Sequence, residues 1–318
     1  MQSTLNQDLR FRFPCVYVYL GVTPPRILAL ESVNHSKAKL QDVREFRVVD
    51  NVISSGAVRA YKDDGVVCLR NAISREWLDV IELGIQQALQ GASADLDVVK
   101  KPGDKGQFSF SSRAWRKVEP FRCFIFDSPI ADLTWPFLES RYMSLYYDFL
   151  LIKEAKSRNA ATPWHQDHAY YPARGSKVIN SWVALDQIPR STALRFYRGS
   201  HQPRTLYRAV NFENQDNDYR HVRKERPEVP DIDNDKGIEI LSTAMEPGDM
   251  LIWNSFTFHC APGNSLDRRR AALSVNWLGD DVTYDEMPAL DTYLDADLAT
   301  GDSLVSRKFP LVRGSVED

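Results

Sequence analysis

Short apolar runs separated by turn residues dominate the chain from about residue 143 onward. These runs are Met143–Lys153, Lys177–Leu185, Ala193–Tyr197, Glu239–Leu241, Met250–His259 and Ala271–Leu278. Runs of this length and spacing are typical of the strands of an antiparallel barrel or sandwich. The pattern therefore predicts a mainly β fold for the second half of the chain.

Helical periodicity appears earlier, over about residues 75–90, where apolar residues recur every three or four positions. Ser74 is a favourable N-cap for this helix, and Gly91 is expected to end it. A second helix is expected over about 129–140, shortened or kinked by Pro136. The mainly β domain should therefore carry flanking helices.

Three segments lack such periodicity. Residues 1–40 are expected to be an N-terminal extension of unclear role, followed by a single domain over 41–318. Residues 92–120 are polar and contain glycine, which predicts a long loop. Residues 203–237 are rich in Asn, Asp, Arg, Lys, Glu and Pro. A polar insertion of this length in a β fold is either a lid over an active site or a solvated excursion.

Composition narrows the possible partners. The net charge is -3 and the pI is about 6.1, which disfavours nucleic-acid or membrane-surface binding. The four cysteines are far apart and form no CxxC pair, so a disulfide framework or structural zinc site is not expected. No apolar stretch is long enough for a transmembrane helix, and no signal peptide is recognisable. We expect a cytoplasmic protein with a small-molecule partner, and the sequence leaves its oligomeric state open.

The segment Thr162–Asp167 carries the first candidate metal ligands. In an extended chain, His165 and Asp167 point to one face and Gln166 to the other. His259 is the best third ligand, at the end of a β-rich run. Two histidines and one carboxylate form a facial triad that suits iron(II) and leaves three adjacent positions open. Each motif alone is commonly structural, and it is their order on a β-rich background that favours a metal site.

Arg270 is a candidate for binding an anionic cosubstrate. Period-two alternation places it on the same face as Ala272, Ser274 and Asn276, which make this face small and polar. An arginine on such a face can bind the distal carboxylate of a dicarboxylate through two parallel hydrogen bonds. The run Arg268–Arg270 could otherwise be a surface charge cluster, and its position after His259 favours the binding role.

The residues quoted so far resemble the phytanoyl-CoA dioxygenase (PhyH) family over about residues 55–280. The resemblance rests on His165-Gln166-Asp167-His168-Ala169-Tyr170-Tyr171-Pro172, Asp63-Asp64-Gly65-Val66-Val67, Trp182, Arg198-Gly199-Ser200-His201, His259 and Arg270. It implies a double-stranded β-helix core of the jelly-roll, cupin-like type with helices packed outside. It also implies iron(II) as cofactor, with 2-oxoglutarate and dioxygen as cosubstrates.

The resemblance assigns roles by position. It implies that His165, Asp167 and His259 bind the metal and that Arg270 binds the C5 carboxylate of 2-oxoglutarate. Trp182 would lie beside the cosubstrate, or would simply be core. Lys153 is a further candidate for binding cosubstrate or substrate, unless it is a surface lysine whose charge reaches water.

Two segments depart from the family pattern. Cys260-Ala261 stands where the family often has Gly-Ser, which puts one hydrogen bond to the cosubstrate in doubt. The usual Pro-Gly-Ser-His turn is Arg198-Gly199-Ser200-His201 here, and we interpret His201 as a turn or core residue.

The implied reaction is hydroxylation of an unactivated C–H bond of a small molecule, with release of succinate and carbon dioxide. Desaturation or ring formation could follow from the same start. Related halogenases lack the carboxylate ligand, so Asp167 argues against halogenation. One alternative is a non-oxygenase metalloenzyme, a hydrolase or isomerase, on the same fold. The other is a non-catalytic binding protein.

The sequence does not name the substrate. Tyr170, Tyr171, His168 and Trp115 are candidates for the walls of its pocket, although His168 could equally be structural. A coenzyme A thioester would need a cationic track for its phosphates, which Arg174, Lys177 and the run Arg220–Arg226 could supply. A hydrophobic natural product or an amino acid fits the sequence equally well.

Overall fold

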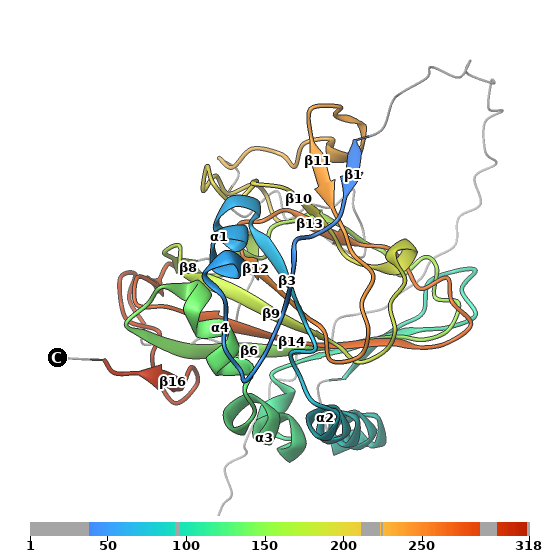
Figure 1. Ribbon diagram of the computed structural model, residues 1–318, viewed down its shortest axis with the longest axis horizontal. Helices are drawn as coiled ribbons and strands as arrows, with labels where there is room; N and C mark the ends of the chain where they lie inside the picture. The colour runs from blue at the N-terminus through green and yellow to red at the C-terminus, as the bar shows by residue number, and fades with distance from the viewer. Residues whose placement is uncertain (1–37, 93–95, 211–222, 224, 287–297, 317–318) are drawn as a thin grey trace, which may run out of the picture. The chain divides into compact units, whose positions relative to one another are not determined.

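The computed structural model describes residues 38–92, 96–210, 223, 225–286 and 298–316. Most of the predicted extension 1–40 therefore lies outside the described residues. Its last residues belong to the fold, because Lys39 and Leu40 lie in a strand. The described part is mainly β, with two sheets and a few helices at the periphery (Figure 1).

The larger sheet has nine strands among the described residues. In spatial order they are β2 (Glu45–Arg47), β3 (Val66–Arg70), β12 (Met250–Asn254), β9 (Val178–Ala184), β14 (Arg270–Leu278), β6 (Tyr142–Lys153), β5 (Phe108–Ser112) and β4 (Asp97–Val99), with β16 (Leu311–Gly314) also paired to β6. All of its pairs are antiparallel except β2 with β3.

The smaller sheet has five described strands. In spatial order they are β1 (Lys39–Gln41), β11 (Glu239–Leu241), β10 (Arg195–Tyr197), β13 (His259–Ala261) and β7 (Thr162–His165). A separate two-stranded ladder joins β8 (Ala173–Arg174) to β15 (Thr283–Tyr284). Two sheets of mostly antiparallel strands are the arrangement of the predicted double-stranded β-helix.

Four α-helices lie in the described residues: α1 (Ser55–Asp64), α2 (Arg75–Gln87), α3 (Glu119–Asp127) and α4 (Ile130–Leu138). Short helical turns add η1 (Ala88–Ala92), η2 (Ala114–Arg116), η3 (Asp167–Tyr170), η4 (Arg190–Thr192) and η5 (Ile232–Asn234). Gly84 lets α2 and α3 pack closely, because a Cβ at this position would lie 2.5 Å from the Phe121 ring. Figure 1 shows both helices on one side of the sheet that contains β6 and β14.

Alternation along the strands of the larger sheet divides the apolar residues into two cores. One face packs against the helices, with Leu150, Ile152, Leu273 and Trp277 among its buried residues. The opposite face contributes to a second core between the sheets, which contains Trp182, Phe196, Leu251, Trp253 and Ala272. The interior between the sheets is therefore where side chains of β9, β12 and β14 meet those of the smaller sheet.

Most predicted elements are confirmed, including both helices and the position of Pro136 inside α4. The predicted loop over 92–120 is wrong, because this segment contains β4, β5 and η2. The single run predicted over 250–259 is also divided: residues 255–258 form a turn between β12 and β13. This turn moves the chain from the larger sheet to the smaller one, which apolar periodicity alone does not reveal.

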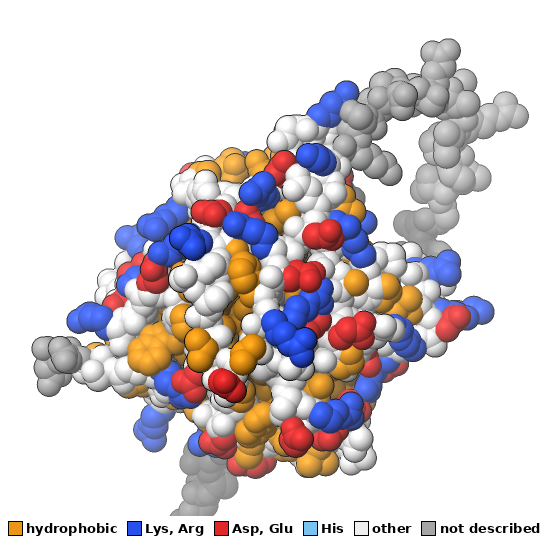
Figure 2. All heavy atoms as spheres, in the orientation of Figure 1, with side chains coloured by type: hydrophobic (Ala, Val, Ile, Leu, Met, Phe, Trp, Pro, Cys, Tyr) orange, Lys and Arg blue, Asp and Glu red, His pale blue; other side chains and the backbone are white. Residues whose placement is uncertain are grey.

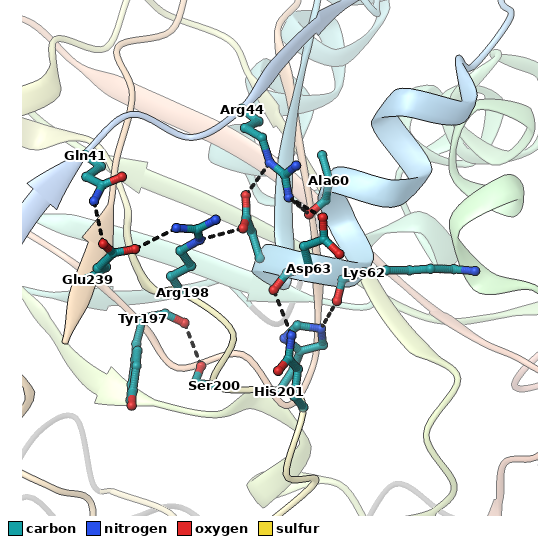
Figure 3. A network of polar contacts seen from close by, with 12 residues as sticks. Gln41, Arg44, Ala60, Lys62, Asp63, Tyr197, Arg198, Ser200, His201 and Glu239 are labelled. Carbon is teal, nitrogen blue, oxygen red and sulfur yellow. Dashed lines mark hydrogen bonds and ion pairs between the residues drawn. The ribbon is translucent and has the colours of Figure 1, made fainter. Parts of the chain in front are cut away.

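A buried carboxylate ties α1 to the smaller sheet. Asp64, 2 % exposed, accepts hydrogen bonds from Arg44 at 2.6 Å and from Arg198 at 2.7 Å. Arg198 also pairs with Glu239 at 2.7 Å, and His201 Nε2 lies 3.0 Å from the Lys62 carbonyl (Figure 3). The predicted turn role of the segment around His201 is therefore confirmed.

We expect Asp64→Ala to lower the free energy of unfolding by about 2–3 kcal/mol, since it leaves two guanidinium groups without their shared carboxylate. The arginines are about 40 % exposed, which keeps the loss below that of a fully buried pair. Urea unfolding measures the change. Asp63→Ala is the matched control, with an expected loss below about 0.5 kcal/mol because Asp63 is exposed. Equal losses in the two variants would contradict the interpretation.

A second buried carboxylate, Asp148 on β6, has a different environment. Its two oxygens accept from the Trp115 backbone N–H at 3.2 and 3.3 Å. Burial raises the pKa of Asp148 to about 7, against the opposing effects of this backbone contact and of the nearby Arg113 and Arg116. The folded protein therefore holds a proton on Asp148 at a pH where the unfolded chain has released it.

The sign of the pH dependence follows from that difference. Between about pH 4 and pH 7 the unfolded state loses the Asp148 proton first, so this group's contribution to stability falls as the pH rises, by up to about 1.4 kcal/mol per pH unit. Asp148→Asn should remove this contribution. Urea unfolding of both proteins at several pH values should show the wild type losing stability relative to Asp148→Asn as the pH rises. Parallel curves would contradict the assignment.

Candidate metal centre and cosubstrate pocket

Adjacent strands of the smaller sheet bring the two predicted metal-binding histidines together. His165 is the last residue of β7 and His259 is the first of β13, and the two are direct partners in the antiparallel ladder. Gln166 keeps an extended backbone, with φ −112° and ψ 130°, before η3 begins at Asp167. The alternation predicted for the motif therefore holds as far as Asp167.

The three predicted ligands converge on one point. One ligand atom from each of His165, Asp167 and His259 lies within 4.8 Å of the other two. His165 Nε2 is 3.3 Å from Asp167 Oδ1, and His259 Nε2 is 3.5 Å from Asp167 Oδ2. Two nitrogen donors and one carboxylate are a set that fits a divalent transition metal.

Backbone carbonyl groups orient both imidazole rings. His165 Nδ1 lies 2.8 Å from the Pro163 carbonyl oxygen, and His259 Nδ1 lies 3.1 Å from that of Thr257. A carbonyl oxygen can only accept, so each Nδ1 carries the hydrogen and each Nε2 keeps its lone pair toward the site. Burial lowers the pKa of His259 to about 4, against the opposing effect of Asp167, and this keeps the ring neutral.

Asp167 is held ionised by its neighbours. Burial by itself would raise its pKa, but His259, His165 and a hydrogen bond from Trp253 together lower it to about 2. Asn180 Nδ2 donates to Oδ2 at 2.8 Å, and Trp253 Nε1 donates to the same oxygen at 3.1 Å. These donors fix the direction of the carboxylate.

Two buried cations lie on the inner face of the larger sheet. Arg270 on β14 and Lys153 on β6 are direct partners in the ladder and are 6 % and 2 % exposed. Lys153 donates to the Pro262 carbonyl at 3.1 Å, and Arg270 donates to the Thr192 and Pro262 carbonyls. Neither has a carboxylate partner among the described residues, and backbone carbonyls are the acceptors of their hydrogen bonds there.

Burial acts on both cations. It lowers the pKa of Arg270 to about 10, and burial followed by repulsion from Arg270 lowers the pKa of Lys153 well below its usual value. Buried charges in proteins are normally paired. Two neighbouring cations without an acidic partner therefore form a site suited to an anion such as a dicarboxylate.

The family model for phytanoyl-CoA dioxygenase (PhyH) matches residues 61–272, more than half of the chain, and this range contains every residue of the triad and both cations. The chain belongs to the PhyH family. No curated protein sequence matches it.

Solved structures of non-haem 2-oxoglutarate-dependent enzymes share the fold. The carbocyclase SnoK from nogalamycin biosynthesis is 22% identical over 82% of this chain and 97% of its own, with a TM-score of 0.64. The epimerase SnoN, in complex with Fe3+, α-ketoglutarate and nogalamycin RO, is 19% identical over 81% and 98%, with a TM-score of 0.62. EvdO2 from Micromonospora carbonacea var. aurantiaca, complexed with 2-oxoglutarate, is 18% identical over 72% and 92%, with a TM-score of 0.54.

Trp182 of this PhyH-family chain lies in the core between the sheets, and Cys260 follows the candidate ligand His259 on β13. Trp182 is buried between the sheets and is aligned with Ser274 on β14, which lies on the same face as Arg270. Burial raises the pKa of the Cys260 thiol to about 12, so it stays protonated. The position of Trp182 is therefore compatible with the prediction that it lies beside the cosubstrate, which stays a prediction.

Two of the residues predicted to line the substrate pocket have structural surroundings instead. His168 is 1 % exposed, and its ring nitrogens lie 3.0 Å from Ser255 Oγ and 3.2 Å from the Ala173 carbonyl oxygen. Trp115 belongs to the core between sheet and helices, where its ring contacts Phe126 edge to face. These contacts give both residues a structural role, and contact of His168 or Trp115 with substrate stays a prediction.

Tyr170 and Tyr171 lie nearer to the metal centre. The Tyr170 ring centroid is 6.0 Å from that of His165, and the Tyr171 hydroxyl donates to Asn276 Oδ1 at 3.1 Å. Tyr170 also bonds both polar backbone atoms of Val210, at 2.7 and 2.8 Å. Contact of either tyrosine with substrate stays a prediction.

The first described residues of the polar segment 203–237 are tied to the metal motif. Gln166, 1 % exposed, donates to the Thr205 carbonyl at 3.0 Å and accepts from the Tyr207 backbone N–H at 3.0 Å. Residues 211–222 and 224 lie outside the described residues. The role of this segment as a lid stays a prediction.

Sequence reasoning missed Asn180 and Trp253, the two donors to Asp167. Both lie on the inner faces of neighbouring strands and are direct partners in the ladder between β9 and β12. A buried Asn within the apolar run over 178–184 was a usable signal, because a buried amide needs polar partners. The partner itself could not be identified without the pairing of the strands.

We expect Asn180→Ala to weaken binding of cobalt(II), used as a spectroscopic substitute for iron(II), by about tenfold, since partners that orient a ligand are worth ten- to a hundredfold in metal affinity. Titration followed by the visible absorption of cobalt measures this affinity. Asn159→Ala, which removes an exposed side chain that donates to the Pro102 carbonyl at 2.9 Å, is the control and should bind like the wild type. An unchanged affinity in Asn180→Ala would show that Asp167 is oriented without it.

Proposed function

We propose that this PhyH-family chain is an iron(II)- and 2-oxoglutarate-dependent dioxygenase that hydroxylates an unactivated C–H bond of a small molecule. Succinate and carbon dioxide would be the coproducts. His165, Asp167 and His259 would hold the iron, and Arg270 with Lys153 would bind the distal carboxylate of 2-oxoglutarate.

The pair of buried cations is the observation that carries this proposal. A hydrolase or isomerase on the same fold would use the triad alone and would have no need for two desolvated cations on the inner face. A dicarboxylate whose keto-acid end binds the metal has its second carboxylate free to reach such a pair. The arginine supplies two parallel donors, and the lysine regains its proton beside the incoming negative charge.

The protein's own groups position the reaction. When bound, iron with 2-oxoglutarate and dioxygen supplies an oxidant strong enough to remove hydrogen from an unactivated carbon. The two imidazoles and the ionised Asp167 offer three ligand atoms on one side, which leaves the other side for the cosubstrates. Trp253 and Asn180 keep the carboxylate of Asp167 directed at the metal.

The structural neighbours support removal of a hydrogen atom from carbon as the first step of the reaction, and their different activities indicate that different products can follow from it. SnoK is a carbocyclase and SnoN an epimerase, and SnoN was solved with a nogalamycin. Ring formation, epimerisation and hydroxylation can all begin with removal of a hydrogen atom from carbon. Asp167 supplies the carboxylate that halogenases lack, so halogenation is disfavoured. We propose hydroxylation as the outcome here, with desaturation or ring formation from the same start as the alternatives.

We propose a small-molecule partner and a cytoplasmic location. On the face shown in Figure 2, Lys and Arg side chains are interspersed with Asp and Glu and form no single basic patch of the kind that binds nucleic acid. Within the described ranges, none of the helices has both the length and the apolar character needed to span a bilayer.

Arg270→Ala should weaken 2-oxoglutarate binding to the anaerobic iron(II) protein by about a hundredfold, because a charge-assisted bidentate contact is lost. The weak visible charge-transfer band of the iron–2-oxoglutarate chelate measures binding, and succinate formed after oxygen is admitted measures uncoupled turnover. Lys153→Met should weaken binding less, by about tenfold. His165→Ala should lose both band and succinate.

Arg269→Ala is the matched control. Arg269 is the neighbour of Arg270 in sequence but pairs with Glu82 at 2.8 Å, so its loss should leave the band and succinate formation unchanged. A wild-type protein that binds iron(II) tightly yet gives neither band nor succinate would overturn the oxygenase proposal and favour a non-oxygenase metalloenzyme.

A further inference from the structure

Strand β5 reverses the usual relation between polarity and burial. Its serines, Ser109 and Ser111, are 1 % and 0 % exposed, whereas Phe108 and Phe110 are only half-buried. Apolar rings normally occupy the buried face of a strand. The rings of this strand therefore line a surface that is still open.

The same surface continues on β6. Tyr147, Phe149 and Leu151 are half-buried, while the residues between them are buried in the opposite direction, toward the helices. The ring centroids of Phe108 and Phe110 are 5.2 Å apart, those of Phe110 and Phe149 are 5.8 Å apart, and those of Phe149 and Tyr147 are 6.4 Å apart. We call Phe108, Phe110, Phe149 and Tyr147 the aromatic wall.

Strand register places the aromatic wall on the inner face of the larger sheet. Phe108 is the ladder partner of Lys153, which is the partner of Arg270. Phe149 is the partner of Ser274, which is the partner of Trp182 in the core between the sheets. Directly opposed residues in a sheet point to the same side, so the wall faces the interior that holds the cations.

The wall spans the distance between the two halves of the candidate site. At one end, Lys153 Nζ lies 5.4 Å from the centre of the Phe108 ring. At the other, the Tyr147 hydroxyl lies 3.0 Å from that of Tyr171, which donates to Asn276 Oδ1. Asn276 is the ladder partner of Asn180, the donor to Asp167. A molecule resting on the wall would therefore lie beside both the cosubstrate and the metal.

We propose that the aromatic wall binds the substrate and selects for a planar, ring-bearing molecule without a long acyl chain. This inference rests on the proposed function. Half-exposed rings recover free energy when an apolar ligand covers them, and aromatic pairs add an attraction of their own in edge-to-face or offset geometry. Two aliphatic side chains, Leu151 and Val99, point to the same side as the partners of Phe110 and Phe108, and four aromatic rings form the rest of this surface.

The described cations argue against a coenzyme A thioester. Arg174 pairs with Asp285 at 2.8 Å, and Lys177 pairs with Asp280 at 2.6 Å. Arg223 pairs with the other oxygen of Asp285 at 2.6 Å. Arg174, Lys177 and Arg223 are therefore occupied by acidic partners, which phosphates would have to displace. Arg226, the other described basic residue of the run, donates to the Ala169 backbone carbonyl at 3.0 Å.

Two neutral alcohols test the inference: anthracenemethanol, which is planar and tricyclic, and dodecanol, which is linear. Their affinities are measured on the anaerobic protein loaded with iron(II) and 2-oxoglutarate, directly by fluorescence for anthracenemethanol and by competition for dodecanol. We expect the wild type to prefer anthracenemethanol. The double change Phe110→Leu with Phe149→Leu should weaken anthracenemethanol binding roughly tenfold or more, through the loss of two ring contacts, and leave dodecanol binding nearly unchanged.

Phe126→Leu is the matched control, because Phe126 is also half-buried but packs on the helical side of the sheet. It should change neither affinity. The iron–2-oxoglutarate band shows that each variant is folded and loaded, and the single changes Phe110→Leu and Phe149→Leu replace the double change if it loses the band.

The outcomes separate this inference from the proposed function. Suppose that the wild type shows the band. If it then binds dodecanol at least as tightly as anthracenemethanol, or if the double variant keeps the preference for anthracenemethanol, the role of the aromatic wall is overturned and the oxygenase proposal is left intact. A wild-type protein without the band overturns the oxygenase proposal, whatever it binds.

Discussion

The ladder contact between His165 and His259 is the constraint on which the candidate site depends. It places two imidazoles side by side, with ring centroids 4.2 Å apart, although the residues are far apart in the sequence. The strand β13 reaches this position only because the chain leaves β12 through the turn over 255–258. That turn is secured from outside: Thr257 donates to the Gly65 carbonyl at 2.9 Å, and the Phe258 backbone N–H donates to Ser200 Oγ at 2.9 Å.

The network around Asp64 therefore supports the metal centre from a distance. Gly65 follows Asp64 with φ +83°, and a Cβ at this glycine would lie 2.5 Å from both His201 and Thr257. The Asp-Asp-Gly turn of α1 and the Gly-Ser-His turn after β10 can approach this closely only because Gly65 has no side chain. Thr257 in turn orients His259 through its carbonyl, so the Asp-Asp-Gly turn acts on the metal centre through geometry and not through its own chemistry.

The sequence was sufficient for the parts of the site that follow from local periodicity. Alternation within the segment around His165 predicted the shared face of His165 and Asp167, and alternation after Arg269 predicted the inner position of Arg270. Partners supplied by other strands could not be predicted in this way. Asn180 and Trp253 meet Asp167 through the pairing of β9 with β12, and His168 turns toward Ser255 because the chain enters η3. The β5 strand was missed because its Phe-Ser-Phe-Ser pattern lies in an otherwise polar segment.

The same alternation explains how one sheet serves both stability and chemistry. Along β6, the buried Leu150 and Ile152 pack on the helices, while Phe149 and Lys153 project to the other side. Burial of apolar side chains on the helical face stabilises the fold. The inner face can therefore keep partly exposed rings and cations without acidic partners. Such groups lower stability when they stand alone, because desolvated charge and open apolar area both cost free energy. A bound dicarboxylate and a ring-bearing molecule would remove the two costs together, and this couples occupancy of the interior to the stability of the fold.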